Sequence, residues 1–297
     1  MRMIRVGTCS WTEKSLIQSG EWYPKTARTA ETRLKYYSEH FNTVEVDSTY
    51  YAIPTKSNAY LWAQRSPEDF LFHIKVYGVL TGHAVDPRSL PPDIRSELPA
   101  KDRIQKYLYI REPKLLNLIA EKFLESLYPL ISTGKLGIFV FQFPPWFTYK
   151  EKHLEYILSC NRIMGRVPIA VEFRHGSWYT SEAREKVFHF LRKNQIIHVV
   201  ADEPQYGTMA TVPFMPQTTA DIAYYRLHGR NKENWLKKGI ETSLRYAYEY
   251  SDEELKGFLP HVEISAKTAK TTYVMFNNCH GGSAMRNAEK MKGILKG

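Results

Sequence analysis

Eight short runs rich in β-branched and aromatic residues alternate with longer stretches of helical character, and this alternation constrains the fold most strongly. The runs are Ile4–Cys9, Thr43–Asp47, Phe70–Lys75, Leu136–Phe143, Pro168–Arg174, Ile196–Asp202, Ile222–His228 and Thr272–Asn277. Helical stretches include Thr29–His40, Pro113–Ser132, Glu151–Met164, Ser181–Lys193 and Asp252–Ala269. Eight repeats of strand and helix predict an α/β fold whose parallel strands close into a TIM-type (β/α)8 barrel. A doubly wound open sheet is the alternative, but no GxGxxG motif follows the first run.

The length of 297 residues suits a single barrel domain spanning residues 1–297. The segment Tyr77–Glu112, between the third and fourth strands, is too long for an ordinary connection and contains Pro91-Pro92. It is predicted to be an inserted excursion over the strand ends that acts as a lid. A smaller insertion, Asn231–Tyr250, follows the seventh strand and carries Trp235.

Composition narrows the cellular context and the class of partner. The N-terminus shows no apolar signal segment and no stretch is long enough for a membrane helix, so we expect a cytoplasmic protein without a membrane partner. Three widely spaced cysteines exclude a disulfide framework and any CxxC motif. The formal net charge of +10 favours contact with phosphates or other polyanions, although scattered surface lysines and arginines give the same total.

Polar side chains recur where the predicted strands end. Residues two apart on a strand share a face, so Glu172 and Arg174 lie together, as do Arg226 and His228. Because helix-facing positions should be apolar, these polar sets are expected to face the barrel axis. The same rule gives an inner set of Cys9, Asp47, Lys75, Gln142, Glu172, Arg174, Asp202, Arg226, His228 and Asn277. In barrels the C-terminal ends of the strands hold the active site.

The residue types in this set suggest roles in binding and catalysis. Glu172 and Asp47 are candidate general bases, and His228 is the candidate general acid. Guanidinium and ammonium groups match phosphate oxygens. The predicted substrate-binding residues are Lys75, Arg174, His175, Arg226, Arg230, Asn277 and Asn278. In the alternative interpretation, the carboxylates of Glu45, Asp47, Glu172 and Asp202 pair with Lys75, Arg174 and Arg226 in a structural ion-pair network.

Other chemistries have less support. Gly281-Gly282, before the helical stretch Ala284–Ile294, could present backbone N–H groups to a phosphate or form a plain turn. No cofactor is predicted. A divalent metal is possible, with ligands drawn from six histidines beside Glu172 and Asp202, but no ligand motif supports it. Those histidines are His73, His83, His175, His198, His228 and His280. There is no GxSxG motif, and Cys9 is expected to be inert packing.

Five stretches resemble the YecE-like family, the domain of unknown function 72. They are Phe41-Asn-Thr-Val-Glu-Val-Asp-Ser-Thr-Tyr-Tyr51 with Pro54, Phe141-Gln-Phe-Pro-Pro-Trp-Phe147, Val171-Glu-Phe-Arg-His-Gly-Ser-Trp178, Tyr225-Arg-Leu-His-Gly-Arg230, and Tyr273–Asn278 followed by Asn287-Ala288. The resemblance covers essentially the whole chain. It departs at Gly7-Thr-Cys-Ser-Trp11, where the family typically has Gly-Thr-Ser-Gly-Trp, so it assigns no role to Cys9. The resemblance implies the barrel fold and supplies no reaction.

These observations favour an enzyme that acts on an anionic, phosphate-bearing substrate at the C-terminal face of the barrel. Hydrolysis of a phosphodiester-like bond, or isomerisation of a sugar-phosphate or nucleic-acid unit, suits the residues. The alternative is a non-catalytic nucleic-acid-binding protein that uses its basic surface and exposed aromatic rings. The enzyme requires a concave site, whereas the binding protein requires basic residues along an open face. The partner is therefore an anionic small molecule or a nucleic acid.

Overall fold

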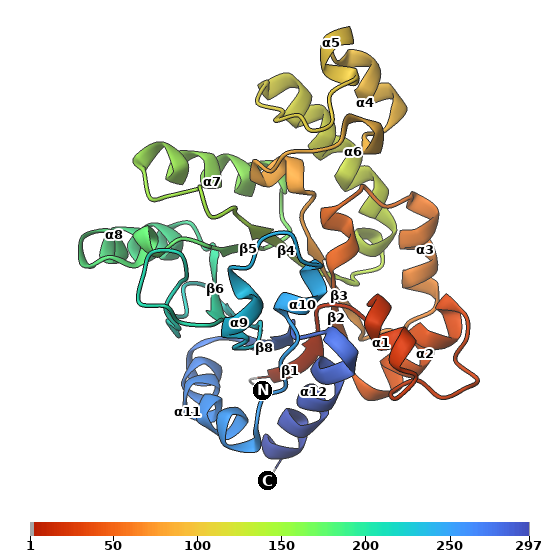
Figure 1. The fold of residues 1–297 in the computed structure, drawn as a ribbon, viewed down its shortest axis with the longest axis vertical. Coiled ribbons are helices and arrows are strands. Elements are labelled where there is room, and N and C mark those ends of the chain that lie inside the picture. Colours follow the sequence, from red (N-terminus) through yellow and green to blue (C-terminus); the bar gives the residue numbers. More distant parts are fainter. Residues whose placement is uncertain (1–2, 297) are drawn as a thin grey trace.

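Eight parallel strands form a closed barrel in the order of the sequence, which confirms the predicted fold class (Figure 1). A computed structural model describes residues 3–296. The strands are β1 (Met3–Thr8), β2 (Thr43–Val46), β3 (Leu71–Lys75), β4 (Leu136–Gln142), β5 (Ile169–Glu172), β6 (Ile197–Asp202), β7 (Ile222–Leu227) and β8 (Thr271–Phe276). Closure comes from β1, which pairs with β8 over six residues, from Met3 opposite Thr271 to Thr8 opposite Phe276.

Helices surround the barrel, but one expected helix is absent. The helices are α1 (Lys14–Ser19), α2 (Ala30–His40), α3 (Lys56–Gln64), α4 (Pro92–Glu97), α5 (Ala100–Arg103), α6 (Pro113–Ser132), α7 (Glu151–Ile163), α8 (Ser181–Lys193), α9 (Lys232–Trp235), α10 (Thr242–Arg245), α11 (Asp252–Thr268) and α12 (Ser283–Ile294). The sequence predicted a helix after every strand. The link 203–221 between β6 and β7 contains none, and its prolines Pro204, Pro213 and Pro216 oppose a regular helix there.

Local sequence signals explain where the long helices begin. Ser251 caps α11 through a capping box with Glu254, and Thr180 caps α8 by accepting the N–H of Ala183. Pro113 occupies the first turn of α6, where its missing N–H costs nothing, and the Glu112 side chain caps the same turn. No helix within residues 3–296 is long and apolar enough to cross a membrane.

The chain between β3 and α6 makes a long excursion that contains α4 and α5. Figure 1 shows these two short helices projecting away from the barrel, and α4 packs against α6. At the start of the excursion, His83 packs edge-on against Tyr50, which follows β2, with ring centroids 5.1 Å apart. The excursion also returns to this side through Tyr109, whose ring lies 6.4 Å from that of Trp146 after β4, and its role as a lid stays a prediction.

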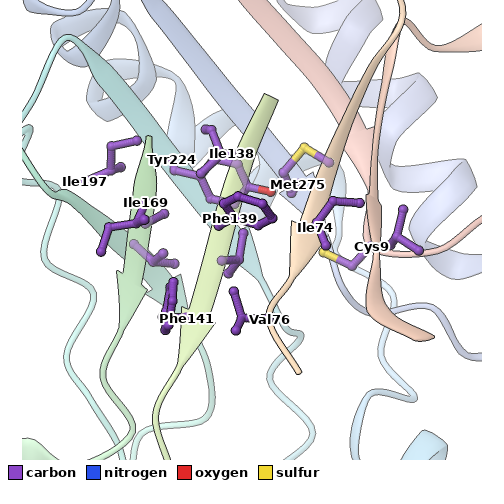
Figure 2. Packing of buried hydrophobic residues seen from close by; sticks show 14 of the residues in the cluster. Cys9, Ile74, Val76, Ile138, Phe139, Phe141, Ile169, Ile197, Tyr224 and Met275 are labelled. Carbon is purple, nitrogen blue, oxygen red and sulfur yellow. The ribbon is translucent and has the colours of Figure 1, made fainter. Parts of the chain in front are cut away.

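Apolar side chains fill the space around the strands. Phe139 and Phe141 lie two apart on β4 and are both fully buried (Figure 2). Phe139 packs against Phe123 of α6 with ring centroids 5.9 Å apart, so this face of β4 meets the helix layer. The intervening positions of the strand consequently face the barrel axis.

Candidate functional site

Side chains from distant strands meet inside the barrel, and Arg226 of β7 is at their centre. Strand β7 is hydrogen-bonded to β6 and β8, yet the side chain of Arg226 contacts carboxylates on β2 and β5. Its Nε and Nη2 donate to the two oxygens of Glu45 at 3.0 and 2.6 Å, and its Nη1 donates to Glu172. Such contacts cross the barrel axis, which confirms that these polar residues face inward. Arg226 is fully buried, and all three of its nitrogens are occupied.

Glu172 of β5 collects four donors. Its Oε1 accepts from Gln142 at 2.6 Å, from Arg174 at 3.1 Å and from His228 at 3.1 Å, while Oε2 accepts from Arg226. Burial opposes ionisation, but Arg226 and His228 outweigh it and hold the pKa of Glu172 well below its usual range. Glu172 is therefore a buried carboxylate with its hydrogen-bonding capacity filled.

The imidazole of His228 is held in one tautomer. The Asn277 amide donates to Nδ1 at 2.8 Å, so the ring proton is on Nε2, which donates to Glu172. Burial lowers the pKa of His228 to about 4, despite the attraction of Glu172. His228 is thus a neutral link between Glu172 and Asn277.

A pH experiment tests this neutral state. Because the folded pKa of His228 lies below that of the unfolded chain, the unfolded state takes up a proton first as the pH falls. The resulting stability is present above pH 6.5 and is lost toward pH 4. Replacing His228 by Gln, whose amide also donates and accepts, should flatten the slope of unfolding free energy between pH 6 and 5 by about 1.4 kcal/mol per pH unit. Urea melts of both proteins over this range give the slopes, and equal slopes would contradict the assignment.

A cleft of about 300 Å³ opens at the C-terminal ends of the strands, beside this buried cluster. Its lining residues are Ser10, Thr12, Glu13, Asp47, Ser48, Tyr51, Lys75, Thr242, Ser243, Tyr246, Asn277, Cys279 and His280. Lys75 Nζ lies 3.4 Å from Asp47 Oδ1, and Arg226 Nη2 lies 3.4 Å from the same oxygen. The Asp47 side chain is 27% exposed, so this carboxylate connects the cleft to the buried cluster.

The second insertion covers the mouth of the barrel. Figure 1 shows α9 and α10 in the middle of the ring of helices. Trp235 and Tyr246 from this segment each lie 5.9 Å from the His228 ring, measured between ring centroids. The Arg174 guanidinium sits 4.9 Å from the centre of the Trp235 ring. The sequence had marked this insertion without predicting that it closes over the polar cluster.

The comparisons with known proteins fit this architecture. The family model described as "Protein of unknown function DUF72" matches residues 5–297 of the chain. The chain belongs to the DUF72 family. This membership confirms the resemblance that its five sequence motifs indicated.

One curated relative and two solved structures match this DUF72 chain over nearly its whole length, and a second curated relative matches part of it. UPF0759 protein YunF of Bacillus subtilis is 32% identical over 296 residues, which cover 99% of this chain and 95% of YunF. UPF0759 protein YecE of Escherichia coli is 30% identical over 82 residues, or 28% of this chain and 26% of YecE. Among solved structures, a DUF72 protein from Thermotoga maritima shares 32% identity with a TM-score of 0.78 and covers 99% of this chain and 100% of its own. One from Enterococcus faecalis has 30% identity and a TM-score of 0.79, with coverages of 99% and 96%.

Asp202 was predicted to join the inner set of this DUF72 barrel, and that prediction is wrong. It accepts from Arg230 at 2.9 Å and from the Tyr250 hydroxyl at 2.7 Å, both on the helix-facing side. His198, four residues earlier on β6, also faces outward, toward Phe188 of α8 with ring centroids 5.0 Å apart. Because side chains alternate, the inward residue at this strand end is Glu203. Its carboxylate lies 3.4 Å from Arg174, and burial raises its pKa to about 7, against the pull of that cation.

Three of the predicted substrate-binding residues make contacts that stabilise the fold, and they do not line the cleft. Arg230 pairs with Asp202 and, at 3.0 Å, with Glu254 of α11. His175 accepts the N–H of Ser177 at 3.1 Å and caps a short turn. Asn278 is fully buried and donates to the Tyr248 carbonyl at 2.8 Å, which fixes the covering segment.

Neighbouring residues of the chain fill the space beside the Gly281-Gly282 loop where a phosphate would have to bind. The N–H of Gly281 donates to Ser15 Oγ at 2.8 Å, and a Cβ at Gly282 would lie 3.3 Å from Leu16 of α1. The plain-turn interpretation is therefore the better account of this loop. Cys9 is fully buried, and burial raises the pKa of its thiol well above the usual range, as expected of inert packing. Within residues 3–296, no group of three or more histidine, cysteine or acidic side chains is arranged to hold a metal.

The inner cluster contains its own counter-ions. Lys75, Arg174 and Arg226 face four carboxylates, those of Glu45, Asp47, Glu172 and Glu203. Of the four cations predicted to bind an anion, only Lys75 lines the cleft; Arg226 is saturated by carboxylates, Arg174 is covered by Trp235, and Arg230 lies outside. The ion-pair network and the cleft are thus adjoining parts of one cluster, and Asp47 belongs to both.

Proposed function

We propose that this protein is an enzyme that acts on an anionic substrate, a phosphate ester by class, in the cleft at the C-terminal face. The observation that carries the proposal is the Lys75–Asp47 pair, a cation and a carboxylate that line one cleft side by side. A buried ion pair with no access to solvent would be a structural feature. This pair instead borders a cleft at the position where barrel enzymes carry their active sites.

Lys75 is the group that would bind the anion. Burial disfavours its charge, but Asp47 outweighs that penalty and raises the pKa of the ammonium group, so Lys75 is charged at neutral pH. An ammonium has three donors, and the ion pair with Asp47 at 3.4 Å does not use all of them. The hydroxyls of Ser10, Ser48 and Tyr246 line the same cleft and supply further donors for phosphate oxygens.

Asp47 is the candidate general base. Both of its ion pairs are made by Oδ1, which leaves Oδ2 as the oxygen to accept a proton from a hydroxyl or a water. Glu172 and His228 were candidates for base and acid, and both are fully buried behind Arg226 and Asn277. In this proposal they position the two groups that reach the cleft. Glu172 holds Arg226, which in turn contacts Asp47, and His228 orients the Asn277 amide.

The experiment is a thermal melt with and without phosphate at matched ionic strength. Phosphate at a hundredfold excess over its dissociation constant should stabilise the wild type by about 2.7 kcal/mol. Lys75→Met should lose most of that stabilisation, because the remaining donors are neutral. Lys56→Met, at an exposed lysine of α3, is the matched control and should keep it. Equal phosphate shifts in wild type and Lys75→Met would exclude Lys75 as the anion-binding group.

A further inference from the structure

Four large aromatic side chains are exposed in the segments that leave the C-terminal ends of β2, β3 and β4, where burial would be their ordinary state. They are Tyr51 at 65%, Trp146 at 57%, Tyr109 at 49% and Tyr107 at 62% exposure. Tyr51 follows β2, Trp146 follows β4, and both tyrosines above position 100 belong to the excursion. We call these four residues the aromatic track. A half-exposed tryptophan in a run of exposed tyrosines indicates a surface that is covered by a partner.

The rings form a connected series that begins at the cleft. Tyr51 lines the cleft and packs on Tyr50 with centroids 5.0 Å apart. Tyr50 contacts His83, and His83 in turn contacts Trp146 at 5.6 Å. Trp146 contacts Tyr109 at 6.4 Å. All four contacts are edge-to-face, with interplanar angles of 67° to 88°, and the exposed rings of the series, Tyr51, Trp146 and Tyr109, keep ring surface in solvent on which planar groups could stack.

Cations accompany the rings along the series. The Lys75 ammonium lies 4.9 Å from the Tyr50 ring, the Arg111 guanidinium 5.9 Å from Tyr109, and the Lys106 ammonium 5.7 Å from Tyr107. A neutral oligosaccharide would stack on such rings without needing cations. Rings that each have a positive charge beside them match a polymer that carries planar groups and a phosphate at every unit.

We propose that the aromatic track binds single-stranded nucleic acid, with bases against Trp146 and the exposed tyrosines and a phosphate at Lys75. The proposal rests on the proposed function, since it names the strand whose phosphate would occupy the cleft. It also combines the two functions that the sequence left as alternatives, an enzyme and a nucleic-acid-binding protein. The nucleic-acid strand would lie on the open face, and the chemistry would take place where the end of that strand enters the cleft. The net charge of +10 favours the encounter.

The test measures binding of a fluorescein-labelled 12-nucleotide oligo(dT) strand by anisotropy at fixed salt. Wild type should bind it, and Trp146→Ala should weaken binding by roughly 5- to 150-fold, the range for loss of one base–aromatic stack. Trp146→Phe keeps a ring and should recover most of the affinity. Tyr128 is the matched control, because it is also an exposed tyrosine beside a lysine, Lys56, with the ammonium 5.8 Å from its ring. It lies near the end of α6 that leads into the start of β4, and Tyr128→Ala should leave affinity unchanged.

The outcomes distinguish this proposal from the one it rests on. If Lys75→Met loses the phosphate stabilisation but Trp146→Ala binds the strand as tightly as wild type, the aromatic track is contradicted and the anion site is supported. Strand binding that needs Trp146, with phosphate shifts unaffected by Lys75→Met, would keep the track and overturn the anion site. Trp146-dependent binding of a neutral hexasaccharide, with no binding of the strand, would assign the track to glycans and contradict the proposal.

Discussion

Replacing Arg226 by Met is expected to destabilise the protein by about 3–5 kcal/mol, because it leaves two carboxylates buried without their cation. Glu45 and Glu172 are both fully buried, and Arg226 joins them across the barrel. Methionine fills much of the same volume, so the loss measures charge and hydrogen bonding more than packing. Urea denaturation at pH 7, followed by circular dichroism, gives the free energy of unfolding.

Two variants make this expectation specific. Arg88→Met removes an arginine whose partner Asp86 is on the surface, and it should leave the unfolding free energy nearly unchanged. Adding Glu45→Gln to Arg226→Met removes one of the stranded charges and should recover part of the loss, since residues in one network couple. A loss of stability in Arg226→Met no greater than in Arg88→Met would mean that the network does not stabilise the fold.

The barrel and most of its inner face could be predicted because alternation along a strand is a local property. Knowing that Val44 and Val46 of β2 face the helices is enough to place Glu45 and Asp47 inside, and the contact of Glu45 with Arg226 agrees. The same reasoning placed Glu172 and His228. Each prediction needed only a few consecutive residues, and parallel strands bring those ends together whatever the loops do.

The rest depended on information that a single segment does not carry. Asp202 was assigned inward because it is polar, whereas the parity set by His198 of the same strand makes Glu203 the inward residue. The sequence also did not reveal which of the four cations predicted to bind an anion would remain accessible from the cleft. Arg174 is covered by Trp235 from a segment some 60 residues later, and that contact exists only once the covering loop has folded back. Loops fold back in ways that periodicity does not encode.

The two tryptophans of the sequence motifs should respond to alanine in opposite ways. Trp178 is fully buried, stacks on Phe173 with ring centroids 4.1 Å apart, and donates its indole N–H to the Phe147 carbonyl at 2.6 Å. Trp178→Ala therefore leaves a cavity and an unpaired carbonyl, and we expect a loss of about 3–5 kcal/mol in the free energy of unfolding. Trp146 is mostly in solvent, so Trp146→Ala should change stability by no more than about 0.5 kcal/mol.

Measured together, these variants separate what holds the barrel from what the barrel binds. Urea melts and strand-binding titrations on both proteins should show Trp178→Ala losing stability and Trp146→Ala losing affinity. Trp178→Ala should still bind the strand below its unfolding transition, because Trp178 is fully buried and presents no ring surface to a base. A large loss of stability in Trp146→Ala would mean that its ring supports the excursion through His83 and Tyr109. Its exposure would then reflect a structural role, and the aromatic track would lose its principal residue.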